Sequence, residues 1–220
     1  MAYAGSITTN SVVIPVAPHW LTASRVNKVC DRIERVLEWD IRRVTVRWHQ
    51  QEGEFQKAIG LPGNTAAVLA VAKRGENAIH IGTRVTSENF DAVFGHELAH
   101  IVMFQKYKDA IPKWLDEGLA NYAARNGKID YKYLESQITR SGAGLDVRAM
   151  THPFKETKIE PKFHYLASTA LIEMIASKCR MADLLQLSLG KGLESYLETF
   201  CRIKDVNAEF TKWVKKKAGN

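Results

Sequence analysis

Two histidines four residues apart constrain this chain more than any other feature. They stand in residues 95–100, Gly-His-Glu-Leu-Ala-His, inside a stretch (88–107) whose apolar residues recur at helical spacing. On a helix, residues four apart share one face, so both imidazoles point the same way and suit Zn²⁺. Glu97 lies about 100° round the helix from His96 and can contact a metal-bound water without binding the metal. The pentapeptide alone also fits an exposed helix face that carries two histidines.

A third ligand is expected because a catalytic zinc has three protein ligands and one open position. Glu117 follows His100 after sixteen residues, which is enough for the first helix to end, for a loop over residues 108–111, and for a second helix over residues 112–125. Glu117 then lies about one turn into that helix and can face the histidines. Asp116 is the competing ligand, but it lies about 100° away around the helix.

The remaining candidates at this site are weaker. Asn121 lies four residues after Glu117, on the same helix face, and is placed to hold the non-ligating nitrogen of His96. Asp116 and Asn121 also fit ordinary surface positions. His80 is interpreted as a strand side chain rather than a ligand. The other histidines without a partner at ligand spacing are interpreted as structural or exposed: His19, His49 and His152.

The combined pattern resembles a known family. His96 to His100, followed by residues 112–120, Pro-Lys-Trp-Leu-Asp-Glu-Gly-Leu-Ala, resembles the gluzincin zinc peptidases. The likeness is greatest to the compact peptidase MA-like branch, whose pattern reads HExxH and then PxWLxEGxA. Residues 78–81 resemble the strand that forms the sheet edge along which substrate lies, and residues 165–175 resemble a helix further downstream.

The resemblance implies a zinc metallopeptidase with a zincin-like fold and one zinc per chain, held by His96, His100 and Glu117. It implies that Glu97 acts as general base and acid while a zinc-activated water attacks a peptide or protein substrate. No GxMEN-type strand precedes His96, which favours an endopeptidase over an aminopeptidase. Two alternatives are a catalytically silent zincin-fold binding or regulatory module and a nucleic-acid-associated protein with structural zinc. A closed structural zinc site, however, prefers four Cys or His ligands.

Gluzincins generally also use a later Tyr or His to stabilise the oxyanion. We favour Tyr165, which lies about 200° from Phe163 on the predicted helix over residues 161–178 and therefore opposite its apolar stripe. A tyrosine whose hydroxyl points into water is the alternative interpretation. The other candidates are His164, Tyr107 and His152.

The rest of the chain predicts an α+β fold: a small mixed N-terminal sheet with the active-site helix, followed by a mostly helical C-terminal half. Residues 1–220 are interpreted as a single minimal domain, with strands and one helix over 1–86 and helices over 87–220. Expected strands cover residues 12–16, 44–48, 55–59, 67–72 and 78–81, the last two as a hairpin. Expected helices cover residues 21–39, 88–107, 112–125, 161–178, 181–189, 193–201 and 206–214.

Composition excludes several classes. Hydrophobic residues make up 45% of the 220, too many for a disordered chain. Lysine and arginine exceed aspartate and glutamate by 31 − 24 = 7, but no nucleic-acid-binding module accompanies this charge, so no nucleic-acid partner is expected. No apolar run could span a bilayer.

Cysteine usage bears on the compartment. Cys30, Cys179 and Cys201 are expected to be buried thiols, because they are few and scattered. A cytoplasmic location is the default expectation, and a secreted or periplasmic one holds if the chain is a mature form without its signal peptide. The oligomeric state is not specified by the sequence.

Overall fold

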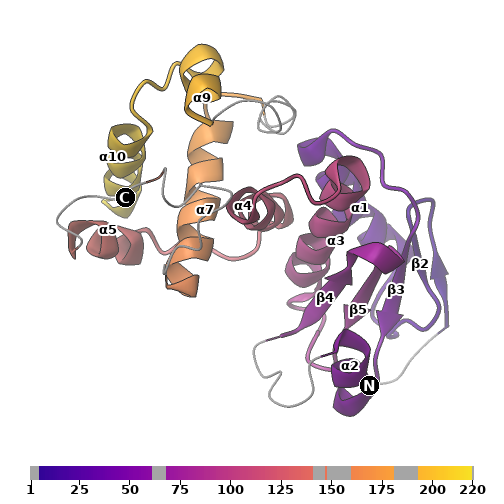
Figure 1. Cartoon of the computed structure of the whole chain (residues 1–220). Coiled ribbons are helices and arrows are strands. Elements are labelled where there is room, and N and C mark those ends of the chain that lie inside the picture. The colour runs from indigo at the N-terminus through magenta and orange to yellow at the C-terminus, as the bar shows by residue number, and fades with distance from the viewer. Residues whose placement is uncertain (1–4, 61–67, 141–146, 148–159, 181–192, 220) are drawn as a thin grey trace. The chain divides into compact units, whose positions relative to one another are not determined.

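A computed structural model of the chain describes residues 5–60, 68–140, 147, 160–180 and 193–219 (Figure 1). It confirms the α+β fold class, with a five-stranded sheet in the N-terminal part and helices after it. The expected helix over residues 181–189, the beginning of the strand over 67–72, and His152 lie outside the described residues.

The sheet has the strand order β1-β2-β3-β5-β4. Its strands are β1 (Ile7–Thr8), β2 (Val12–Ile14), β3 (Val44–Trp48), β4 (Ala70–Lys73) and β5 (Ala78–Ile81). β3 pairs in parallel with both β2 and β5, while β1–β2 and β4–β5 are antiparallel. The expected hairpin is confirmed as β4–β5. The expectation that residues 78–81 form the sheet edge is wrong, because β5 lies between β3 and β4, and β4 is the edge strand.

Three helices belong with the sheet: α1 (Ala23–Leu37), α2 (Glu52–Ile59) and α3 (Phe90–Tyr107). The strand expected over residues 55–59 is wrong, since this segment is part of α2. Phe55 and Ile59 are both buried four residues apart, which is a helical spacing, and Gly60 ends the helix with a φ of 74°.

The core of this part lies between the sheet and α1 and α3 (Figure 1). Alternate residues of β3 and β5 share this face, and the ring of Trp48 stacks on Phe90 of α3 at 5.9 Å. At the beginning of α1, Arg25 Nε lies 2.7 Å from the Asp91 carboxylate on α3. The two helices therefore run side by side with their N-terminal ends together, and α3 is held on the sheet.

The later helices are α4 (Lys113–Ala124), α5 (Tyr131–Arg140), α7 (Pro161–Ala176), α9 (Leu193–Cys201) and α10 (Val206–Ala218). All but α5 match expected helices. A polar network joins α5, α7 and α10, in which the Tyr131 hydroxyl donates to Glu173 at 2.6 Å and Lys217 Nζ donates to the same carboxylate at 2.8 Å. The Trp213 indole donates to the Tyr131 hydroxyl at 3.2 Å. Burial and the bond to Glu173 raise the pKa of Tyr131.

The chain forms two compact units. The first holds residues 1–108 and 123–126, and the second holds residues 109–122 and 127–220, so the boundary passes through α4. The single-domain organisation remains a prediction.

The expectation of three free thiols is wrong for two of them. Cys179, just after α7, forms a disulfide with Cys201 at the end of α9, with their Cα atoms 5.4 Å apart. This distance is typical of a disulfide. Cys30 is a buried thiol as expected, and burial raises its pKa to about 12.

Among the helices of the described residues, none has both the length and the apolar character needed to cross a membrane.

Candidate metal centre

His96 and His100 lie one turn apart on α3, as their spacing predicts. His100 is buried and His96 is half-buried. Their Nε2 atoms are 3.1 Å apart, with ring planes at 88° and centroids at 4.6 Å. In a straight hydrogen bond, the centroid separation would exceed the nitrogen separation by roughly 2.2 Å, one ring radius on each side. Here the excess is 4.6 − 3.1 = 1.5 Å. The two nitrogens therefore do not face each other directly, which leaves room for an ion beside the line that joins them.

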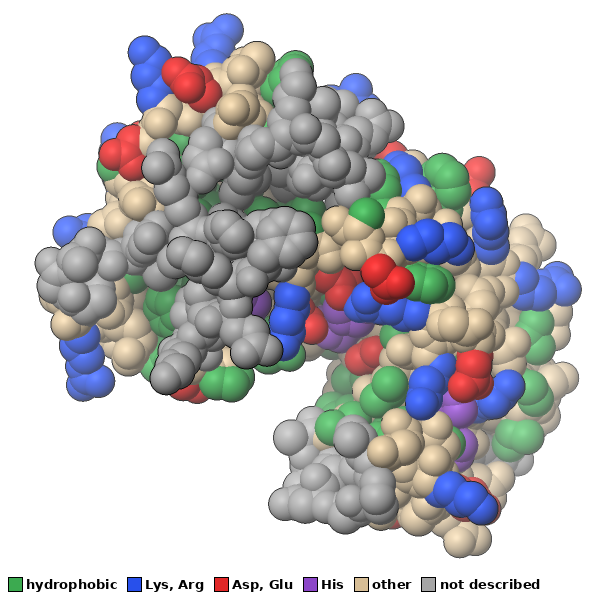
Figure 2. Space-filling model, in the orientation of Figure 1, with side chains coloured by type: hydrophobic (Ala, Val, Ile, Leu, Met, Phe, Trp, Pro, Cys, Tyr) green, Lys and Arg blue, Asp and Glu red, His purple; other side chains and the backbone are tan. Residues whose placement is uncertain are grey.

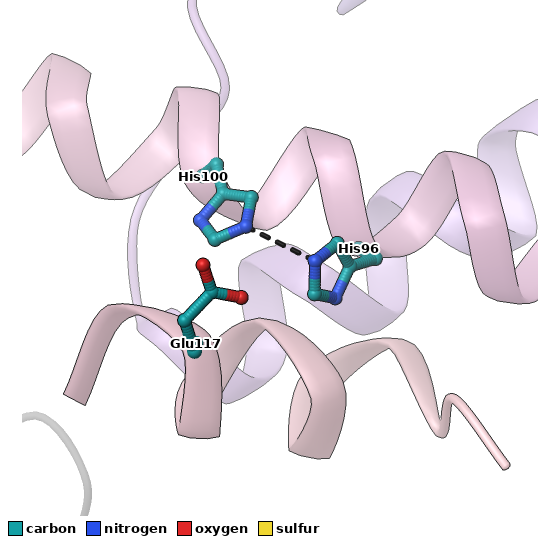
Figure 3. Close-up of side chains that lie close together, drawn as sticks. All are labelled: His96, His100 and Glu117. Carbon is teal, nitrogen blue, oxygen red and sulfur yellow. Dashed lines mark hydrogen bonds between the residues drawn. The ribbon is translucent and has the colours of Figure 1, made fainter. Parts of the chain in front are cut away.

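Glu117 on α4 completes the cluster (Figure 3). One ligand atom from each of His96, His100 and Glu117 can be chosen so that all three lie within 4.8 Å of one another. Two imidazole nitrogens and one carboxylate oxygen form a donor set of catalytic zinc sites, so these residues fit the ion that the sequence predicts. Asp116 is buried and lies outside this cluster.

The last residues of α4, Ala123 and Ala124, belong to the first unit and contact α1 and α3 there. Arg32 Nε on α1 donates to the Ala123 carbonyl at 3.0 Å. Gly95 allows a close approach, because a Cβ atom there would lie 3.3 Å from the Cα atom of Ala124. The glycine that precedes the first histidine is thus explained by helix packing.

Gly118 likewise allows a close approach between helices, here between α4 and α7. A Cβ atom there would lie 2.7 Å from the Ser168 carbonyl oxygen and 2.9 Å from the Ile172 side chain, both on α7. Only a glycine permits this approach of the α7 backbone next to Glu117.

Glu97 points toward the edge of the sheet. Its Oε2 accepts a hydrogen bond from the Ala72 N–H of β4 at 2.7 Å. Along one strand of an antiparallel pair, residues whose N–H and C=O groups bond to the partner strand alternate with residues whose N–H and C=O groups point away from it. Since the Gly82 N–H donates to the Leu69 carbonyl, Ala70 and Ala72 direct their N–H and C=O groups to the open edge.

The comparison with protein families agrees with this geometry. The Peptidase MA superfamily matches residues 40–200, which include β3, α3, α4 and α7. The chain belongs to the Peptidase MA superfamily. The resemblance inferred from the sequence is confirmed at this level, and a possible metallopeptidase follows from it. No curated protein matches the sequence significantly.

Two further side chains of this Peptidase MA member bear on the interpretation of the histidines. Asn121 is half-buried on α4, one turn after Glu117. The contact of Asn121 with the non-ligating nitrogen of His96 stays a prediction. Arg74, in the 3₁₀ turn η1 (Arg74–Glu76) after β4, has Nη2 3.5 Å from His100 Nδ1. The sequence assigned Arg74 no role, because only the hairpin register brings it there.

The candidate oxyanion residues differ in their surroundings. Tyr165 is 38% exposed on α7, and its ring centroid is 6.3 Å from that of His164. His164 is half-buried, and its pKa is lowered first by burial and then by the charge of Lys113. Tyr107 lies seven residues beyond His100 on α3, roughly 10 Å along the helix axis. The function of Tyr165 stays a prediction.

Proposed function

We propose that the protein is a zinc-dependent endopeptidase that holds one zinc ion by His96, His100 and Glu117. The observation that carries this proposal is the convergence of the two histidine nitrogens with a carboxylate from the next helix. When bound, zinc polarises a carbonyl group and lowers the pKa of its water toward 7. The family membership supports the same activity.

In this proposal Glu97 transfers the proton. Glu97 follows His96 in sequence but is not part of the ligand cluster. Its carboxylate therefore does not bind the metal and can accept a proton, as a general base must. The Ala72 N–H holds one carboxylate oxygen, which orients the other to accept a proton from water and to deliver it to the leaving amine. A carboxylate fixed in this way loses little side-chain freedom when substrate arrives.

The substrate is proposed to be an extended peptide segment. The N–H and C=O groups of Ala70 and the C=O of Ala72 point outward on the edge strand, while the Ala72 N–H donates to Glu97. A peptide can therefore pair with β4 as an added strand beside that carboxylate. This moves the docking position from residues 78–81, which the sequence favoured, to β4. Among the described residues shown in Figure 2, basic side chains are interspersed with acidic ones, and the proposal assigns no nucleic-acid partner.

The decisive experiment combines metal analysis with digestion of a peptide library by the wild type and by Glu97→Gln. Both proteins are expected to bind one zinc per chain. Glu97→Gln is expected to cleave about 10²- to 10⁴-fold more slowly, because it lacks the proton acceptor. Glu198→Gln makes the same chemical change on an exposed position of α9 and serves as the matched control.

Absence of bound zinc, or equal cleavage by wild type and Glu97→Gln, would refute the catalytic proposal. Zinc binding without any cleavage by the wild type would instead support the alternative, a catalytically silent binding or regulatory module.

A further inference from the structure

A second pair of histidines lies in the first unit, away from the metal ligands in sequence. His49 follows β3 directly, and its N–H donates to the Ile81 carbonyl of β5 at 2.9 Å. His80 lies on β5, and strand alternation points its side chain to the face opposite Ile81. His80 is 3% exposed, while His49 is half-buried.

The two rings are joined by a straight hydrogen bond. His49 Nε2 and His80 Nδ1 are 2.9 Å apart, the ring planes differ by 14°, and the centroids are 5.1 Å apart. The excess of centroid over nitrogen separation is 5.1 − 2.9 = 2.2 Å, which is about the sum of two ring radii. The nitrogens therefore face each other directly, unlike those of His96 and His100. This geometry fits one shared proton and does not fit chelation of a metal.

Charged groups from three elements face His80. Glu76 Oε2 of η1 lies 3.8 Å from His80 Nε2 and also accepts from Arg47 of β3 at 3.3 Å. Lys73 of β4 acts on His80 from the neighbouring strand. Burial lowers the pKa of His80 most, followed by the charges of His49 and Arg47, while Glu76 raises it.

The surroundings of His49 are less enclosed. Its ring lies 5.8 Å from that of Phe55 on α2. Burial lowers the pKa of His49 most, Glu54 of α2 raises it, and Arg47 lowers it. Both rings of the pair are therefore held toward the neutral form.

We infer that the pair formed by His49 and His80 is an acid-sensitive latch that ties the connection between β3 and α2 to β5. With both rings neutral, one N–H donates to the other ring's lone pair and the latch is closed. With both rings protonated, two N–H donors face each other at hydrogen-bond distance, and the latch opens. Because β5 also pairs with the edge strand β4, the latch supports the strand that holds Glu97.

The direction of the pH dependence follows from linkage. The folded-state pKa values of both rings are lowered relative to the ordinary histidine value. As the pH falls below about 6.5, the unfolded chain therefore takes up protons before the folded chain does. The stability from the latch is fully present above that pH and is lost as the pH falls through the lower folded values.

Two substitutions of His49 separate the hydrogen bond from the titration. His49→Gln keeps an amide donor near the Nε2 position but cannot be protonated, whereas His49→Leu removes the bond. Melting temperatures of the full chain are compared at about pH 7.5 and about pH 5, which bracket the unperturbed histidine value. His19→Gln, at an exposed position, is the control, and the metal ligands contribute equally to all variants.

At neutral pH, His49→Leu is expected to melt about 2–4 °C below wild type, while His49→Gln stays close to it. Between the two pH values, wild type and His19→Gln are expected to lose more stability than either His49 variant. Equal pH slopes for wild type and His49→Gln would overturn the proposal.

A measurement on the wild type covers the case in which a variant does not fold. In ¹⁵N NMR of the histidine rings, two rings are expected to share a proton and to titrate below about 6.5. Independent titration of every ring at ordinary values would also overturn the proposal.

Discussion

At the scale of single residues, two neighbouring carboxylates on α4 have different surroundings. Glu117 is half-buried and belongs to the ligand cluster, whereas Asp116 is 7% exposed and does not. We expect Glu117→Gln to weaken zinc binding by more than the roughly 10–100-fold that loss of an outer partner costs. Asp116→Asn is expected to retain one zinc per chain. Titration of zinc against a competing chelator measures both affinities.

The opposite result would reassign the third ligand. If Asp116→Asn lost zinc while Glu117→Gln kept it, Asp116 would be the ligand and the helix face deduced from the spacing would be wrong. A circular dichroism spectrum of each variant shows whether α4 and its neighbours remain folded.

Tyr165 carries a second prediction at this scale. If its hydroxyl stabilises the oxyanion, Tyr165→Phe lowers kcat by about 10²- to 10³-fold with little change in KM, because the interaction forms only in the transition state. His164→Gln is the competing variant, since His164 is the more buried of the two. Steady-state kinetics on one peptide substrate distinguish them, and a larger kcat loss in His164→Gln would transfer the role to that residue.

At the scale of elements, the contact between α4 and α7 depends on Gly118. We expect Gly118→Ala to lower the free energy of unfolding by about 1–3 kcal/mol, because the added methyl meets the Ser168 carbonyl. Gly53→Ala in α2, where a Cβ meets no atom within 4 Å, is the matched control and should melt with the wild type or slightly above it. Denaturant unfolding measures the difference, and equal midpoints would contradict this packing.

The helices that the sequence predicted best have regular apolar spacing and clear end signals. In α7, Pro161 occupies the first turn, and Glu160 caps it by accepting from the Lys162 and Phe163 N–H groups. Such signals are local, so they can be read from sequence alone. By contrast, α5 has two buried residues, Leu134 and Ile138. Two apolar positions are too few to form a helical periodicity that can be recognised in the sequence.

Apart from residues 55–59 and α5, the errors concern pairing between distant residues. Parallel pairing of β3 with β5 places residues 78–81 inside the sheet, and no local pattern specifies that choice. The closeness of His96 and His100 was predictable because helix geometry converts their spacing directly into direction. The partner of Glu97 was not predictable, because the donor is the backbone N–H of Ala72, and a backbone donor has no signature in the sequence.

At the scale of the whole molecule, the cysteines give a quantitative prediction. A thiol reagent is expected to find no rapidly reacting thiol in the native protein, one in the denatured protein, and three after reduction, because Cys30 is buried and the other two are joined. Three thiols in unreduced, denatured protein would contradict the disulfide.

Reduction should also lower the melting temperature, since a disulfide contributes about 2–4 kcal/mol. Cys201→Ser is expected to reproduce that loss without reductant. Disulfides persist in oxidising compartments, so we propose a secreted or periplasmic location over the cytoplasmic default.

The bond from Ala72 to Glu97 makes the length of a turn important for the chemistry. Backbone groups along β4 alternate between the ladder and the open edge, so a slip of one residue against β5 would turn the Ala72 N–H inward. An insertion or deletion in η1 would therefore leave HExxH unchanged in sequence and yet leave its glutamate without this donor. Among related chains, the number of residues between the two hairpin strands then serves as a marker of which ones keep the proposed proton-transfer group in position.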